Sequence, residues 1–192
     1  MVDSKEKGSS FERFVCRTLS LWISKGSRHD LLWRSAASGG TSMITHAGDV
    51  ASSDPLSYPL VRNFVVECKF RRDLNFAALA YPVVPSSGVV KFWYDLRKLC
   101  YGHRKLPMMI VKANRRKPLI VLNHIGNMCV ENASVEVDRD FVWSTWHDCF
   151  VLGFDDFFRS VDPGRFFEEA SSARDVCEET GNFDRLLEML DE

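Results

Sequence analysis

The feature that most constrains this chain is residues 64–70, FVVECKF, an apolar run that contains one glutamate and one lysine. Because successive side chains of a strand point to opposite faces, Glu67 and Lys69 would share a face, roughly 7 Å apart. The other face would carry side chains directed into a core, namely Phe64, Val66, Cys68 and Phe70. Charged groups beside a core are costly unless they are paired with each other, a metal or a substrate. The run therefore predicts either an exposed ion pair on an edge strand or a polar site built on a buried strand.

The length of 192 residues fits one domain with decoration, or a domain followed by a tail. No apolar run follows a basic start, and no apolar stretch reaches the roughly 18 residues of a membrane span, so we expect neither a signal peptide nor a membrane partner. The six cysteines are scattered without a CxxC pair, and the five histidines show no metal-ligand spacing with them. This pattern predicts reduced packing cysteines in a cytoplasmic protein (host cytoplasm if viral), not disulfides or a zinc site.

Charge divides the chain into two unequal parts. Residues 1–125 hold 20 Lys and Arg against 9 Asp and Glu, whereas residues 126–192 hold 5 against 17. The first part is suited to meet a polyanion and the second is not. We therefore predict a core at residues 1–125 and an acidic, mainly helical C-terminal extension at residues 126–192. The extension would either shield the basic face or be an ordinary acidic decoration.

Apolar periodicity and chain breakers predict an α/β fold with a mixed central sheet flanked by helices. A capping box of Ser9 and Glu12 would open the first helix, whose apolar stripe ends near Gly26. The elements expected after it are a strand at 31–34, a small-residue loop at 35–40, a strand from Gly48, a loop at 52–63, the strand at 64–70, a helix from Ser86 or Ser87 to about 101, a hairpin of 107–113 and 117–122 with a basic tip, short strands near 135–137 and 150–152, and acidic helices from Pro163 onward. Arg97 is expected outside the buried stripe of its helix.

Three short motifs that contain acidic residues follow one another along the chain. A helix carries Glu12, Gly48-Asp49 follows, and the strand with Glu67-Cys68-Lys69 comes next. In this order the chain resembles the PD-(D/E)xK nuclease superfamily over roughly residues 9–122, and within it the archaeal-type Holliday-junction resolvases and small phage endonucleases. The resemblance implies a restriction-endonuclease-like core. It also implies a Mg²⁺-dependent endodeoxyribonuclease, with Mn²⁺ able to substitute, that acts on branched or structured DNA in phage-type recombination or DNA processing, as a homodimer.

The same resemblance implies roles for individual residues. Asp49 and Glu67 would be metal carboxylates, and the main-chain carbonyl of Cys68 would be a further ligand. Glu12 would be an outer or second-metal ligand, and Lys69 would orient or help deprotonate the attacking water. Because a lysine beside bound anions stays charged, we favour orientation and charge stabilisation over general-base work. Hard oxygen ligands of this kind suit Mg²⁺, which activates water for phosphodiester hydrolysis.

Several alternatives stay open at the level of the sequence. The gap between Asp49 and Glu67 is long, so in another strand register Asp54 would be the first metal acid. Candidate DNA contacts are Arg34, Ser38, Arg71, Arg72, Lys112, Arg115, Arg116 and Lys117. No sequence-reading helix is apparent, which favours recognition of DNA shape over base readout. A nuclease fold retained as a catalytically inactive DNA-binding or assembly module is the alternative function.

Overall fold

The computed structural model describes residues 4–35, 47–86, 88–134, 141–144 and 146–191. Ser38 and the strand expected near 135–137 lie outside these ranges. At the centre is a five-stranded sheet in the order β3-β4-β5-β7-β6. Its strands are β3 (Phe64–Arg71), β4 (Leu106–Ala113), β5 (Leu119–Leu122), β7 (Cys149–Gly153) and β6 (Phe141–Ser144). β3 and β4 are parallel, and every other neighbouring pair is antiparallel, so the sheet is mixed as expected.

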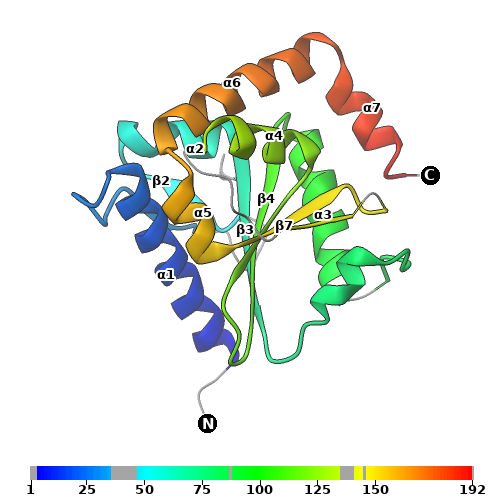
Figure 1. Ribbon diagram of the computed structural model, residues 1–192, viewed down its shortest axis with the longest axis horizontal. Helices are drawn as coiled ribbons and strands as arrows, with labels where there is room; N and C mark the ends of the chain where they lie inside the picture. Colours follow the sequence, from blue (N-terminus) through cyan, green and yellow to red (C-terminus); the bar gives the residue numbers. More distant parts are fainter. Residues whose placement is uncertain (1–3, 36–46, 87, 135–140, 145, 192) are drawn as a thin grey trace.

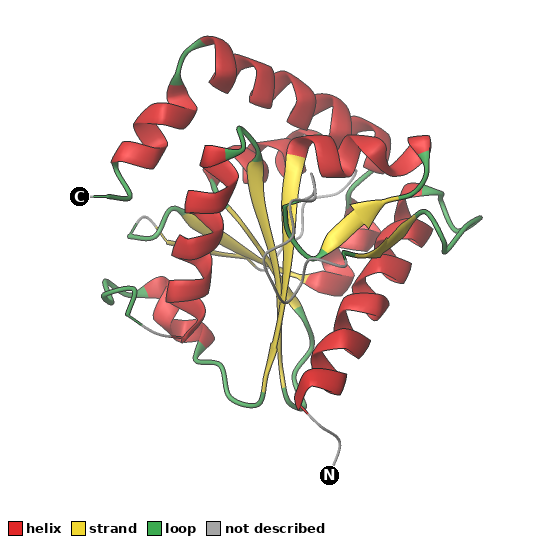
Figure 2. Cartoon of the chain, turned by 180° about the vertical axis from the view of Figure 1, so that it is seen from behind, coloured by secondary structure: helices red, strands yellow, loops and turns green. Residues whose placement is uncertain are grey.

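Helices cover both faces of this sheet (Figures 1 and 2). α1 (Ser4–Ile23) and α5 (Phe154–Ser160) lie on one face, where the ring of Phe14 packs 5.7 Å from that of Phe154. α3 (Gly88–Gly102) covers the other face and connects the parallel strands β3 and β4. Across one end lie α2 (Tyr58–Asn63), α4 (His124–Asn132), α6 (Pro163–Glu179) and α7 (Asn182–Glu188).

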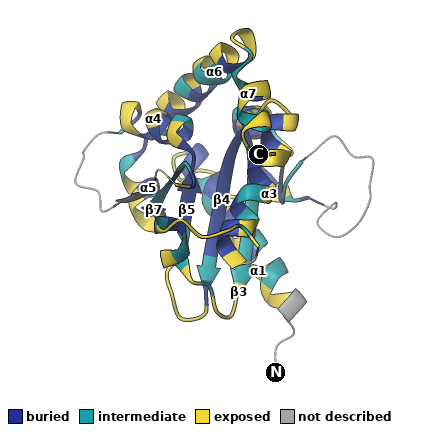
Figure 3. Cartoon of the chain, turned by 90° about the vertical axis from the view of Figure 1, so that its right-hand side faces the viewer, coloured by how far each residue is buried: buried dark blue, intermediate teal, exposed yellow. Residues whose placement is uncertain are grey.

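The strands are apolar because the sheet is buried between these layers (Figure 3). In β4, residues Leu106 to Val111 are all buried, as expected for a strand covered on both faces. In β3, Phe64 to Val66 and Cys68 are buried, whereas Glu67 and Lys69 are partly exposed. The alternation predicted for residues 64–70 is thus present, and it leaves one face of β3 polar near the middle of the strand.

The C-terminal third belongs to the same sheet and core. β7 pairs with β5, and the ring of Phe166 in α6 stacks on Phe64 of β3 with centroids 5.2 Å apart. The Trp22 indole Nε1 donates a 2.8 Å hydrogen bond to the carbonyl of Val161. The described residues after 125 therefore do not stand apart as an extension; they complete the hydrophobic core of the first part.

Three local expectations differ from the structure. α1 begins at Ser4, so Ser9 and Glu12 lie inside the helix and form no capping box. Residues 58–63, expected in a loop because of their prolines, form α2, where Pro59 occupies the first turn, the position in a helix that tolerates proline. Arg97, expected on the surface, is only 6% exposed.

Arg97 is buried because its guanidinium is fully engaged. It donates to the Tyr101 hydroxyl and the His147 carbonyl, and it pairs with Asp148 at 3.1 Å. The six cysteines are all free and buried, which confirms their packing role. Within the described part of the chain, no helix is both long and apolar enough to cross a membrane.

A separate two-stranded ribbon lies beside β3. β1 (Leu32–Arg34) and β2 (Val50–Ser52) are antiparallel, with Trp33 opposite Ala51 and Arg34 opposite Val50. Leu32 and Val50 contribute to the main core, and the amide of Leu32 donates to the Ser20 hydroxyl of α1. One face of the ribbon is therefore fixed against α1.

Candidate active site

Asp49 is anchored to the free edge of β3 by two hydrogen bonds. Its amide donates to the Val66 carbonyl at 2.9 Å, and its carboxylate Oδ2 accepts from the Cys68 amide at 2.8 Å. Its burial is nearly complete, at 7% exposed. The neighbouring Gly48 has φ +92°, and a Cβ there would lie 2.6 Å from the Val66 carbonyl oxygen. Only glycine permits so close an approach to the strand, which explains the Gly-Asp pair.

The Cys68 main chain faces the same edge. β4 pairs along the other edge of β3, and the Cys68 amide points away from it, toward Asp49. Because the amide and carbonyl of one strand residue point to the same side, the Cys68 carbonyl also faces the edge that carries Asp49. A carboxylate and a main-chain carbonyl oxygen thus lie along one edge of β3.

Glu67 and Lys69 form an ion pair on the α3 face of β3. Their side chains are 19% and 22% exposed, so the pair is neither free on the surface nor sealed in the core. The Lys69 ammonium lies 5.5 Å from the centroid of the Phe92 ring, a cation–π contact that orients it. Both residues line a pocket of about 290 Å³ whose remaining walls come from α3, namely Phe92, Asp95, Leu96 and Leu99.

Glu12 reaches the site from α1. It pairs with Arg34 of β1, and its side chain is 14% exposed. Because Glu12 lies inside α1 and not at its N-terminus, its carboxylate does not cap the helix and can pair with Arg34. Arg34, expected as a DNA contact, is thereby engaged with Glu12.

The electrostatics of Asp49 show that the four predicted residues share one environment. Burial, the largest cause, raises the pKa of Asp49 from its ordinary 3.8 to about 7, and the charges of Glu67 and Glu12 add to the rise. The Cys68 amide and the Lys69 ammonium act in the opposite direction. An excess of buried negative charge is the condition that a bound cation relieves.

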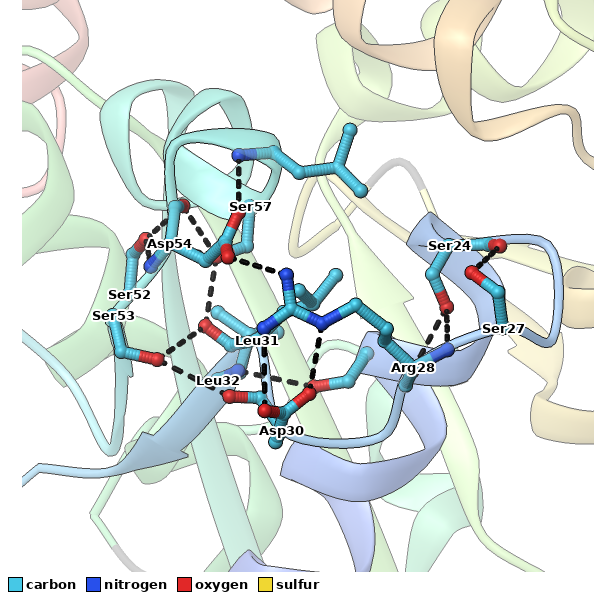
Figure 4. A network of polar contacts seen from close by, with 12 residues as sticks. Ser24, Ser27, Arg28, Asp30, Leu31, Leu32, Ser52, Ser53, Asp54 and Ser57 are labelled. Atoms are coloured by element: carbon cyan, nitrogen blue, oxygen red, sulfur yellow. Dashed lines mark hydrogen bonds and ion pairs between the residues drawn. The ribbon is translucent and has the colours of Figure 1, made fainter.

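Asp54 lies elsewhere and is already engaged. Its carboxylate accepts a 2.9 Å hydrogen bond from the Leu56 amide, which caps a short 3-10 helix, and pairs with Arg28 at 2.6 Å. Both contacts lower its pKa. Figure 4 shows this network, in which Arg28 also pairs with Asp30. The geometry therefore favours Asp49 over Asp54 as the first metal acid.

The oxygen donors on and beside β3 are of the kind that a hard divalent cation prefers. Among the residues that the structure describes, no three His, Cys, Asp or Glu side chains gather as a metal cage. Mg²⁺ does not need one, because it is commonly held by one or two carboxylates with water and phosphate oxygens in the other positions. Asp49, Glu67 and the Cys68 carbonyl supply oxygen donors of this kind.

Basic side chains gather where β3 and β4 end. Arg71 lies at the C-terminal end of β3, on the α3 face of the sheet, and contacts the Phe92 ring. Lys112 lies near the C-terminal end of β4, on the α1 face, and contacts the Phe11 ring. Beyond them lies a hollow of about 1090 Å³ between residues 72–77 and 113–119; its basic lining residues are Arg72, Arg115, Arg116 and Lys117. These six cations were all expected as DNA contacts.

Several basic residues of the first part, one of them in this group, pair with acidic residues of the C-terminal third. Lys25 pairs with Asp162, Arg104 with Asp184, and Lys117 with Asp155. Part of the charge difference between the two regions of the sequence is thus balanced by ion pairs between them. Of the described residues, Lys117 is the cation at the end of β3 and β4 that pairs with this acidic third.

Comparison with known proteins agrees with this geometry. Residues 3–168 match a family model described as "Phage putative PDDEXK endonuclease". The chain belongs to this family. The match includes β7, α5 and part of α6, so the family unit extends well past residue 125 and includes the strands that complete the sheet. The mixed sheet flanked by helices is consistent with a PDDEXK nuclease fold. Searches of curated proteins and of solved structures returned no match.

Two features of the site had no sequence signal. Phe92 shares a helix face with Leu96 and Leu99, but its contacts with Lys69 and Arg71 of β3 could not be read from that spacing. The Glu12–Arg34 pair joins residues 22 positions apart on different elements, and nothing in the local sequence predicts it.

Proposed function

We propose that this protein is a metal-dependent DNA endonuclease that hydrolyses phosphodiester bonds in branched or otherwise structured DNA. The observation that supports the proposal is the buried Asp49 carboxylate, which accepts a hydrogen bond from the Cys68 amide of the strand that also carries Glu67 and Lys69. Family membership supports nuclease chemistry. The resemblance to junction resolvases extends the proposal to branched substrates and to two chains acting together.

In this proposal Asp49, Glu67 and the Cys68 carbonyl hold a divalent cation, Mg²⁺ or Mn²⁺. Such an ion, when bound, supplies a Lewis acid and a water that ionises near neutral pH. Lys69 pairs with Glu67, so we assign it to orienting the attacking water and stabilising charge on the phosphate rather than to accepting a proton. The Phe92 ring holds the ammonium in place, and the Cys68 amide fixes the Asp49 carboxylate.

The basic side chains at the end of β3 and β4 would bind the DNA backbone. Arg72 is 87% exposed at its side chain, and Lys117 is 84% exposed. Contacts from flexible surface cations to phosphates position a duplex without reading its sequence, and they weaken steeply with salt. This arrangement favours recognition of DNA shape.

The test is a cleavage assay on a four-way junction, a flap, a duplex and a single strand, with Mg²⁺, with Mn²⁺ and with EDTA. We expect metal-dependent cleavage by the wild type. Asp49→Asn and Glu67→Gln should each lower the rate by at least about 100-fold while DNA binding persists. Asp95→Asn is the matched control, because Asp95 lines the same pocket but pairs with Lys91.

Two outcomes would contradict the proposal. Cleavage that persists in both Asp49→Asn and Glu67→Gln would remove these carboxylates from the mechanism. DNA binding by the wild type without cleavage of any substrate, under either metal, would favour a non-catalytic DNA-binding module.

A further inference from the structure

Trp33 is a large aromatic side chain that the fold leaves in solvent. It lies on β1 and is 58% exposed. Its cross-strand partner Ala51 is only 2% exposed. The ribbon backbone opposite Trp33 is therefore buried, whereas the indole is in solvent. Tryptophan is highly buried on average, and one exposed on a regular strand is a candidate contact for a partner with a flat apolar face.

The face on which Trp33 lies follows from its neighbours. Leu32 joins the main core and Arg34 pairs with Glu12, so both point toward α1. Strand side chains alternate, and Trp33 therefore points to the opposite side of the ribbon. Glu67 and Lys69 likewise face away from α1, since they line the pocket against α3.

The register places Trp33 close to the carboxylate site. The Ser35 amide donates to the Asp49 carbonyl at 2.8 Å, which continues the pairing of β1 with β2. Asp49 is therefore the diagonal cross-strand neighbour of Trp33, and such neighbours lie about 7–8 Å apart. The indole thus stands within reach of a nucleotide whose phosphate contacts a cation held by Asp49 and Glu67.

We propose that Trp33 stacks on an unpaired nucleobase beside the scissile phosphate, and this inference rests on the proposed nuclease function. Every base has a π-face, so stacking on an aromatic side chain is insensitive to sequence. Bases inside a duplex are stacked on one another and are not available to the indole. The preferred substrate is therefore DNA with an unpaired nucleotide at the cut, such as a single strand, a splayed arm or a branch point.

The first test is binding in EDTA, which excludes cleavage. Full-length wild type and variants are titrated against a fluorescent single strand, a splayed fork and a blunt duplex. Trp33→Leu removes the π-face but keeps an apolar cover, and it should weaken binding to the single strand and fork about tenfold while duplex binding changes little. Trp33→Phe should restore most of the lost affinity. Trp146→Leu is the matched control, because Trp146 is 63% exposed in the turn between β6 and β7, at the far edge of the sheet, and it should bind as the wild type.

A second readout keeps the inference testable if Trp33→Leu folds poorly. Stacking quenches indole fluorescence, so the wild type should be quenched by a single strand and Trp33→Phe should lose that part of the quenching. Equal weakening for duplex and single strand, an unchanged affinity in Trp33→Leu, or the same loss in Trp146→Leu would overturn the inference.

The inference and the proposed function fail in different ways. A protein that cleaves DNA but treats unpaired and paired substrates alike in Trp33→Leu retains its nuclease function and refutes the stacking role. A protein that binds single strands through Trp33 but cleaves nothing retains the stacking role and refutes the nuclease function.

Discussion

The raised pKa of Asp49 makes a quantitative prediction about folding stability. The folded chain holds the Asp49 proton more tightly than the unfolded chain, because the pKa is about 7 in the fold against an ordinary 3.8. Ionising Asp49 therefore costs stability, beginning near pH 4 and complete above about pH 7. At about 1.4 kcal/mol per pKa unit the cost approaches about 4 kcal/mol. This is an upper limit, because water that enters the strand edge reduces the cost of burying charge.

Asp49→Asn removes the ionisation and keeps an oxygen that can accept from the Cys68 amide. We expect the variant to exceed the wild type by no more than about 1 kcal/mol at pH 4.5 and by about 2–4 kcal/mol at pH 8, with EDTA present. Urea unfolding followed by circular dichroism at several pH values measures the difference, and equal m-values show that both chains unfold in the same way. A difference that stays constant with pH, or a variant less stable than the wild type at pH 8, would refute the reasoning.

Three further predictions concern the scaffold and the DNA surface. Gly48→Ala should lower the free energy of unfolding by about 2 kcal/mol more than Gly26→Ala, since both glycines have positive φ but only at Gly48 would a Cβ clash, 2.6 Å from the Val66 carbonyl oxygen; paired urea titrations compare them. Asp148→Asn should lower the free energy of unfolding by about 3–5 kcal/mol, measured by thermal unfolding, because the buried Arg97 guanidinium loses its carboxylate partner. Arg116→Gln should reduce the slope of log affinity against log salt by about 0.9 on duplex DNA, and an unchanged slope would show that Arg116 makes no phosphate contact.

Local periodicity was enough to predict the elements that carry the site. The alternation at residues 64–70 predicted β3 with its polar face, and the apolar runs around residues 114–117 predicted the β4–β5 hairpin. The stripe of α3 was also visible, because helix and strand periods are properties of short segments. Asp49 of the Gly-Asp motif, 18 positions before Glu67, is hydrogen-bonded to the strand that carries the Glu-Cys-Lys motif.

The sequence predictions that differ from the structure concern features set by contacts between distant segments or by where a helix begins. The acidic composition of residues 126–192 suggested an extension, but its aromatic residues fill the core beside Phe64 and Trp22. Arg97 was expected in solvent because charge predicts exposure, and Asp148 across the fold overrides that tendency. The capping box at Ser9 was wrong because residues 4–8 continue the helix by another turn, a choice that a capping motif alone does not decide.

The central claim is that Asp49 and Glu67 hold one divalent cation, and titration of the chain with Mn²⁺, followed by electron paramagnetic resonance of the free ion, tests it most directly. We predict a site in the wild type that is lost in Asp49→Asn and in Glu67→Gln and retained in Asp54→Asn. Mn²⁺ binding that is unchanged in the first two variants, or lost only in Asp54→Asn, would contradict the account.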